Sequence, residues 1–173
     1  KFVFSACVNV CRTIDKGSLK LYLCLRKLYA NLKYSSHLSL VSSVIDGADV
    51  LFERMKQSKQ LVDIITKGIQ EKKGQDIVIA DLSNIEGAIA NYFVICQGNS
   101  PTQVEAISES IGDTVREDLK EKPVNVIGLG ANQWVAIDFT DVLVHVFLPE
   151  TRAFYDLENL WEDAKLTRIP DQD

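Results

Sequence analysis

The sequence Tyr92-Phe93-Val94-Ile95-Cys96-Gln97-Gly98-Asn99-Ser100-Pro101 predicts a strand, a turn and the start of a helix, in that order. Its first five residues are apolar and rich in aromatic and β-branched side chains, which is typical of a central strand covered on both faces. Ser100 then suits a helix N-cap and Pro101 the first helical position, and Gln103, three residues after the cap, completes a capping box. We therefore expect a helix to begin directly after a buried strand.

The residues after Pro101 continue this helix until Pro123 ends it. One face is apolar, with residues three or four positions apart, and the rest of the surface is largely acidic. The apolar positions are Val104, Ile107, Ile111, Val115 and Leu119. A second amphipathic helix is predicted over residues 58–73, with Gly74 as its C-terminal stop.

The remaining segments predict a mixed sheet. Strands are expected at 76–82, 91–97, 124–129, 134–139 and 142–148, and the last two are close enough to form an antiparallel hairpin. A short helix over 153–164 is expected to pack on the core through Phe154, Leu157, Leu160 and Trp161, and the tail after Lys165 is expected to be loose. The fold class is therefore α/β, a mixed β-sheet flanked by helices.

Composition changes near Met55, the single methionine. Residues 1–54 contain 8 basic and 4 acidic residues, net +4, whereas residues 55–173 contain 11 basic and 20 acidic residues, net −9. We expect 55–173 to be the functional domain. Residues 1–54 are an N-terminal extension with three open interpretations: translated sequence upstream of the true start, a transit segment, or an additional helical region around 19–32.

The same composition bears on the compartment. Scattered cysteines, including Cys7 and Cys11, favour a reducing environment over a disulfide framework. No uncharged apolar stretch approaches the ~18 residues needed to cross a bilayer, so we expect a soluble chain without a membrane partner. The predicted location is the cytoplasm, of bacterial type, or an organelle if residues 1–54 are a transit segment.

Residues suited to catalysis are few. The turn Gly98-Asn99-Ser100 could receive phosphate at a helix N-terminus, but it lacks the lysine and second glycine of a P-loop. Asp138 and Asp141 could form a metal-binding pair, although their spacing does not place both on one strand face and aspartate is also favoured in turns. With only two histidines, His37 and His145, a histidine-rich metal site is excluded. We expect no enzyme activity, cofactor or metal. The alternative is a nucleotide-binding, nucleotidyltransferase-like enzyme that uses the Gly98-Asn99-Ser100 turn with Asp138 and Asp141.

A binding function fits the charge better. A domain at net −9 repels nucleic acid and suits a basic protein partner. Trp134 is expected at the start of a strand, near Phe139 and the two aspartates. In one interpretation it is an exposed aromatic anchor, surrounded by carboxylates, that binds a basic surface. In the other interpretation Trp134 closes the edge of the core, and its spacing in the sequence fits both. A surface used for self-association, giving a homodimer of the free chain, is a third hypothesis.

Four segments give the chain a specific resemblance. They are Gly74-Gln75-Asp76-Ile77, the stretch from Tyr92 to Ser100 quoted above, Trp134-Val135-Ala136-Ile137-Asp138-Phe139-Thr140-Asp141-Val142-Leu143-Val144-His145-Val146-Phe147, and Arg152-Ala153-Phe154-Tyr155-Asp156-Leu157-Glu158-Asn159-Leu160-Trp161. In order and separation they resemble the ribosomal silencing factors, also called iojap-like proteins, along residues 56–164.

The resemblance implies a fold related to nucleotidyltransferases without their catalytic acids. It also implies binding to the large ribosomal subunit at its fourteenth-numbered protein, on the face that meets the small subunit, which blocks subunit joining and represses translation when nutrients are scarce. The implied contact residues are Trp134, Asp138, Phe139, Asp141 and His145. This chain departs from the family where Gly128-Leu129-Gly130 replaces the usual Glu-Gly before the tryptophan strand.

Overall fold

The computed structural model describes residues 44–161 and 163–171, with side chains from residue 54 onward. Contacts divide the chain into two compact units. The unit formed by residues 42–85 and 90–173 contains every helix and strand named below, and of the other unit only residues 86–89 are described. The predictions for Cys7, Cys11 and residues 19–32 lie outside the described residues.

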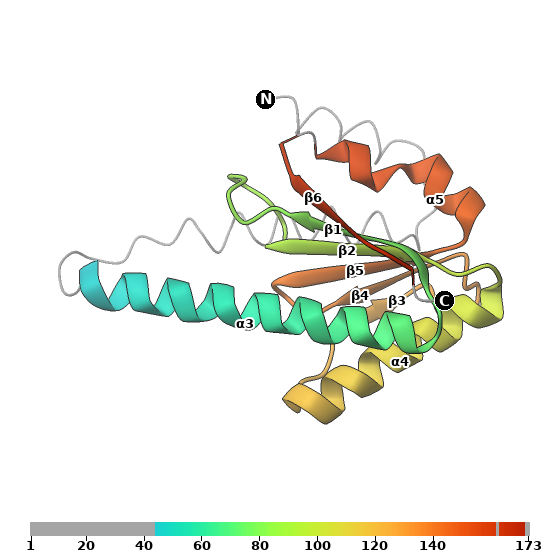
Figure 1. Cartoon of the computed structure of the whole chain (residues 1–173), viewed down its shortest axis with the longest axis horizontal. Coiled ribbons are helices and arrows are strands. Elements are labelled where there is room, and N and C mark those ends of the chain that lie inside the picture. Colours follow the sequence, from blue (N-terminus) through green and yellow to red (C-terminus); the bar gives the residue numbers. More distant parts are fainter. Residues whose placement is uncertain (1–43, 162, 172–173) are drawn as a thin grey trace. The chain divides into compact units, whose positions relative to one another are not determined.

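The helices and strands follow one another along the chain, and Figure 1 labels all of them except a short 3-10 helix. They are α3 (Val44–Glu71), β1 (Gln75–Asp81), β2 (Tyr92–Gln97), α4 (Pro101–Leu119), β3 (Asn125–Ile127), β4 (Trp134–Asp138), β5 (Val142–Phe147), α5 (Pro149–Tyr155), the 3-10 helix η1 (Leu157–Leu160) and β6 (Lys165–Ile169).

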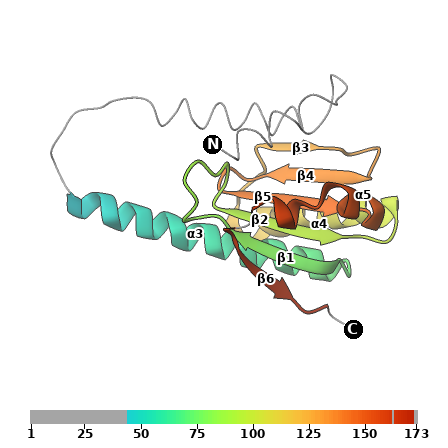
Figure 2. The same cartoon turned by 90° about the horizontal axis from the view of Figure 1, so that it is seen from above.

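The strands form one six-stranded sheet in the order β3-β4-β5-β2-β1-β6, whose edges are visible in Figure 2. β2 and β5 pair in parallel, and the other neighbours pair antiparallel. The predicted hairpin is confirmed, because β4 and β5 pair from Trp134 opposite Phe147 to Asp138 opposite Leu143. The predicted mixed α/β fold is therefore confirmed.

Helices cover the sheet on both sides (Figure 1): α3 and α4 lie on one face, and α5 lies on the other. α4 begins as predicted, because the Ser100 hydroxyl accepts a hydrogen bond from the backbone N–H of Gln103 at 3.2 Å. Its predicted apolar stripe is buried from Val104 to Val115 and packs into the main core with α3 and the strands. Alternate strand residues supply this core and the opposite face, which gives the strands their apolar character on both sides.

Two predictions for the C-terminal part were wrong. The helix expected over 153–164 is instead α5 followed by η1, because Asp156 adopts a left-handed conformation (φ 42°) that ends α5. The tail expected to be loose forms β6, which pairs antiparallel with β1 and thus completes the backbone hydrogen bonding of that strand. Of the four side chains expected to pack on the core, Trp161 is buried, while Phe154 and Leu160 are exposed.

The helix predicted over 58–73 lies within α3, which begins earlier, at Val44. The predicted domain boundary at residue 55 therefore lies inside α3, and it stays a prediction. Met55 itself is exposed on this helix.

Candidate functional site

Trp134 and His145 form a buried pair on the sheet face below α5. The indole Nε1–H donates a hydrogen bond to His145 Nδ1 at 3.2 Å, and the indole stacks on Phe147 with a centroid distance of 4.9 Å. Trp134 is only 8% exposed and His145 is fully buried. The structure therefore places the indole as a residue that closes the core edge, one of the two alternatives left open by the sequence.

Burial also determines the charge of His145. Desolvation lowers its pKa to about 3, so the ring is neutral at physiological pH. Since Nδ1 accepts from Trp134, the ring proton is assigned to Nε2, a buried atom without a hydrogen-bond partner in the described structure. The ring of Phe93 contacts the imidazole edge to face at 5.2 Å. His145 is thus a buried, neutral side chain whose hydrogen bond orients the Trp134 indole.

Asp138, Phe139 and Asp141 surround the turn between β4 and β5. Asp138 is buried, and its carboxylate accepts a hydrogen bond from the backbone N–H of Thr140 at 2.7 Å. Phe139 belongs to the core on the side of α3 and α4. Asp141 accepts two hydrogen bonds from the guanidinium of Arg54 on α3, at 2.7 and 2.9 Å. Of these three residues, only Asp141 reaches solvent appreciably.

The five predicted contact residues do not form one exposed patch. Trp134 and His145 meet, and the other three gather at the turn, but Trp134 and Asp138 are at opposite ends of β4. With a rise of ~3.4 Å per residue, four steps separate them by about 14 Å. Trp134 therefore lies beside α5, whereas Asp141, at the other end, contacts Arg54 of α3.

The residues of the alternative enzyme site are also far apart in the structure. The backbone N–H of Gly98 bonds the carbonyl of Phe147 at one end of the parallel pair, and the N–H of Tyr92 bonds the carbonyl of Asp141 at the other. The Gly98-Asn99-Ser100 turn and the aspartates are consequently about 17 Å apart along β2. Among the described residues, no group of three or more His, Cys, Asp or Glu side chains is placed to hold a metal ion.

Cys96 and Tyr92 are buried residues of β2 that contribute to the core and not to a reactive site. Burial raises the pKa of the Cys96 thiol to about 12, so it stays protonated and unreactive. Burial, followed by the charge of Asp81, raises the pKa of Tyr92. Neither side chain is suited to acid–base chemistry at neutral pH.

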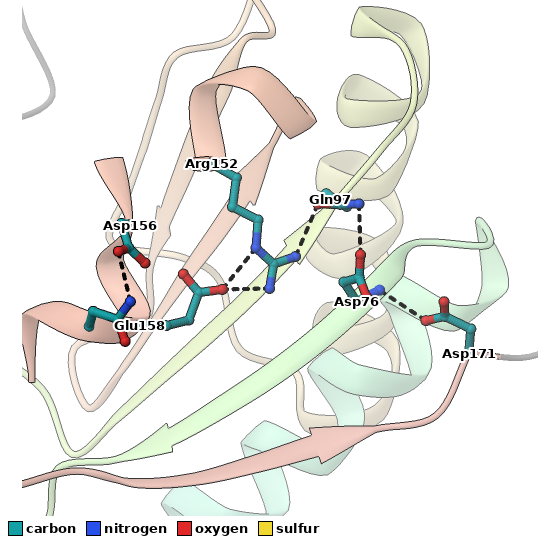
Figure 3. A network of polar contacts seen from close by, with 7 residues as sticks. Asp76, Gln97, Arg152, Asp156, Glu158 and Asp171 are labelled. Carbon is teal, nitrogen blue, oxygen red and sulfur yellow. Dashed lines mark hydrogen bonds and ion pairs between the residues drawn. The ribbon is translucent and has the colours of Figure 1, made fainter. Parts of the chain in front are cut away.

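A polar network fixes α5 and η1 to the sheet (Figure 3). Arg152 donates two hydrogen bonds to one oxygen of Glu158, at 2.6 and 2.8 Å, and one to Gln97 on β2 at 3.3 Å. Gln97 in turn donates to Asp76 on β1 at 2.8 Å, and the Asp76 backbone N–H donates to Asp171 after β6 at 2.9 Å. Because Arg152 and Glu158 are six residues apart and lie in two different helices, no helical spacing in the sequence indicated this pair.

The outer side of α5 and η1 exposes large apolar side chains, which the sequence prediction placed in the core. Phe154 is 78% exposed and Leu160 is 49% exposed. The adjacent aromatic pair Phe154-Tyr155 was an available signal, since neighbouring residues on a helix point about 100° apart and cannot both face one core. The exposed ring is a candidate contact.

Comparisons with known proteins agree with this architecture. A model of the family described as "Ribosomal silencing factor during starvation" matches residues 55–173. The chain is 38% identical over 112 residues to the ribosomal silencing factor RsfS of Bacillus subtilis, covering 64% of this chain and 92% of that protein. It is 32% identical over 109 residues to the chloroplastic Iojap protein of Zea mays, covering 61% and 45%.

Solved structures give the same result. A protein from Chromobacterium violaceum, known from an X-ray crystal structure, superposes with a TM-score of 0.58 and 30% identity, covering 62% of this chain and 88% of that one. None of the helices in the described part of the chain has the length and apolarity required to cross a membrane. The family model covers well over half of the sequence. The chain therefore belongs to the ribosomal silencing factor family, whose members bind ribosomes and are not enzymes.

Proposed function

We propose that this chain binds the large ribosomal subunit through its fourteenth-numbered protein and blocks association with the small subunit, thereby repressing translation. The observation that carries the proposal is the family match over residues 55–173. The same residues carry net −9, from 11 basic and 20 acidic side chains. Such a charge suits a cationic protein on the joining face better than ribosomal RNA.

The mechanism needs no turnover. A folded unit of ~119 residues has a radius of gyration of about 13–14 Å, so a chain seated on the joining surface occupies space that the small subunit would fill. Binding of an acidic surface to a basic one weakens as salt rises, since exposed charges are screened beyond about 8–10 Å at physiological ionic strength. The block is therefore steric and sensitive to ionic strength.

We further propose separate roles for the five predicted contact residues. Asp141 is partly exposed at the turn, and it supports a direct contact once its ion pair with Arg54 yields to a partner cation. The other four are buried and support the contact by holding the hairpin. A homodimer of the free chain remains a prediction, as does a bacterial cytoplasmic location with an organelle as the alternative.

A subunit-joining assay tests the proposal. Purified large and small subunits are mixed at permissive Mg²⁺ with increasing amounts of the chain, and the joined particle is measured by light scattering and gradient sedimentation. We expect joining to fall in proportion to the chain bound to the large subunit, and order-of-addition experiments to show less effect on preformed particles. Equal joining with and without saturating chain would contradict the proposal.

A further inference from the structure

Phe154 is exposed, and its ring is connected to the sheet through other aromatic rings. Its ring contacts Tyr155 edge to face at 5.0 Å, and Tyr155 contacts Trp134 at 4.6 Å. Trp134 stacks on Phe147 and is hydrogen-bonded to His145 in the sheet. This series of ring contacts connects a largely exposed phenylalanine to the buried face of the sheet.

The segment after α5 is also fixed. The ion pair of Arg152 with Glu158 is largely buried, at 2.6 Å, and ties η1 to α5 and to Gln97. Leu160, at the end of η1, is exposed despite this anchoring. We call Phe154 and Leu160, with the neighbouring acids Glu150 and Asp156, the α5–η1 patch.

The charge around this patch is negative. Glu150 precedes Phe154 by four residues and therefore shares its helix face. In the described residues 149–161, Arg152 is the sole cation, and its ion pair with Glu158 offsets its charge. Glu150 and Asp156 are exposed, and within the described residues neither forms an ion pair, although the Asp156 carboxylate accepts a hydrogen bond from the Asn159 side chain at 2.7 Å. An apolar anchor fringed by carboxylates complements a surface rich in lysine and arginine.

We propose that the α5–η1 patch is the surface that docks on a cationic protein of the large subunit, with Phe154 as its apolar anchor. An arginine of the partner can stack on the exposed ring while its charge is matched by the flanking acids. Trp134 and His145 are positioning residues that support Tyr155 and, through it, Phe154. This inference rests on the proposed function and adds the α5–η1 patch to Asp141 as a contact surface.

Co-sedimentation of the full chain with purified large subunits tests the patch. Phe154→Ala is compared with Val124→Ala, a matched control because Val124 is 70% exposed and precedes the edge strand β3. We expect Phe154→Ala to weaken binding by about 30-fold, as for an interface hot spot, and Val124→Ala to leave it unchanged. Phe154→Tyr, which keeps the ring, should retain most of the affinity. Glu150→Lys should weaken binding and flatten its dependence on salt.

The outcomes separate the two proposals. If the unaltered chain fails to bind large subunits, the proposed function fails. If it binds, and Phe154→Ala and Glu150→Lys bind within twofold of it, the patch is overturned while the function stands. If light scattering shows that Phe154→Ala abolishes self-association without changing subunit binding, the patch is a contact between copies of the chain, which also overturns the inference. Thermal melts check that each variant is folded, and Glu150→Lys decides the matter should Phe154→Ala unfold.

Discussion

Gly128 lies against the backbone carbonyl of Trp134, with no room between them for a β-carbon. Its φ of +98° is also a conformation that residues with side chains rarely adopt. Gly128 begins the Gly128-Leu129-Gly130 segment that departs from the family pattern. The glycine at position 128 thus has a structural reason, since the backbone between β3 and β4 packs directly against the backbone of Trp134.

Gly128→Ala should therefore be strongly destabilising, by more than about 3 kcal/mol, because the left-handed backbone and the collision act together. Gly130 is the matched control, since it has a similar φ of +92° but open space around it. Gly130→Ala should cost only about 1–2 kcal/mol, the conformational part alone. Urea unfolding of both variants measures the difference, and equal losses would show that the contact with Trp134 is unimportant.

Buried His145 makes the stability depend on pH. Its folded pKa, about 3, is below the ordinary value of 6.5, so between these values the unfolded chain binds a proton that the native chain excludes. The contribution is fully present above pH 6.5 and is lost as pH falls toward 3. Between pH 7 and pH 5, this single group should lower the free energy of unfolding by about 2 kcal/mol.

His145→Gln isolates that effect, because the amide oxygen can still accept from Trp134 but the side chain does not titrate. The change in unfolding free energy between pH 7 and pH 5, measured by urea titration at each pH, should be about 2 kcal/mol smaller in the variant. A wild-type chain that loses no more stability than the variant over this range would contradict the burial of a neutral imidazole.

The elements predicted best are those whose determinants lie close together in the sequence. The start of α4 follows from Ser100, Pro101 and Gln103, and the hairpin follows from two apolar runs separated by two residues. These signals are local, and a capping hydroxyl or a short connection has the same effect in any context. The fold class therefore follows from the sequence alone.

The predictions that were wrong concern segments whose structure depends on residues far away in the sequence. β6 exists because β1 offers it a backbone edge to pair with, although its own residues 165–169 are mostly exposed and polar. The exposure of Phe154 depends on Asp156 ending α5 and on Tyr155 taking the place against Trp134. Trp134 itself could have closed the core or faced solvent, because one strand position does not reveal which helix covers it.

The Arg152–Glu158 pair should be important for stability. Arg152→Met leaves a largely buried carboxylate without its cation, and we expect a loss of about 3–5 kcal/mol. The double variant Arg152→Met, Glu158→Gln should recover part of this loss, because no uncompensated charge stays buried. Arg116→Met is the control, since its ion pair with Asp113 is exposed and should contribute less than about 1 kcal/mol. If the double variant is as unstable as the single one, the arginine acts through packing.

The contact of Arg54 with Asp141 predicts a weak, salt-sensitive coupling between α3 and the β4–β5 turn. The guanidinium donates to both carboxylate oxygens, but its side chain is more than half exposed, so solvent screens the pair. A double-mutant cycle with Arg54→Ala and Asp141→Ala should give a coupling of about 0.5–1 kcal/mol at low salt that falls toward zero at 1 M salt, where the screening length is about 3 Å. The Lys67–Asp118 pair, with a single contact at 3.3 Å, should couple less in the same measurement. A coupling that is independent of salt would mean that Arg54 holds the turn through its aliphatic stem instead of its charge.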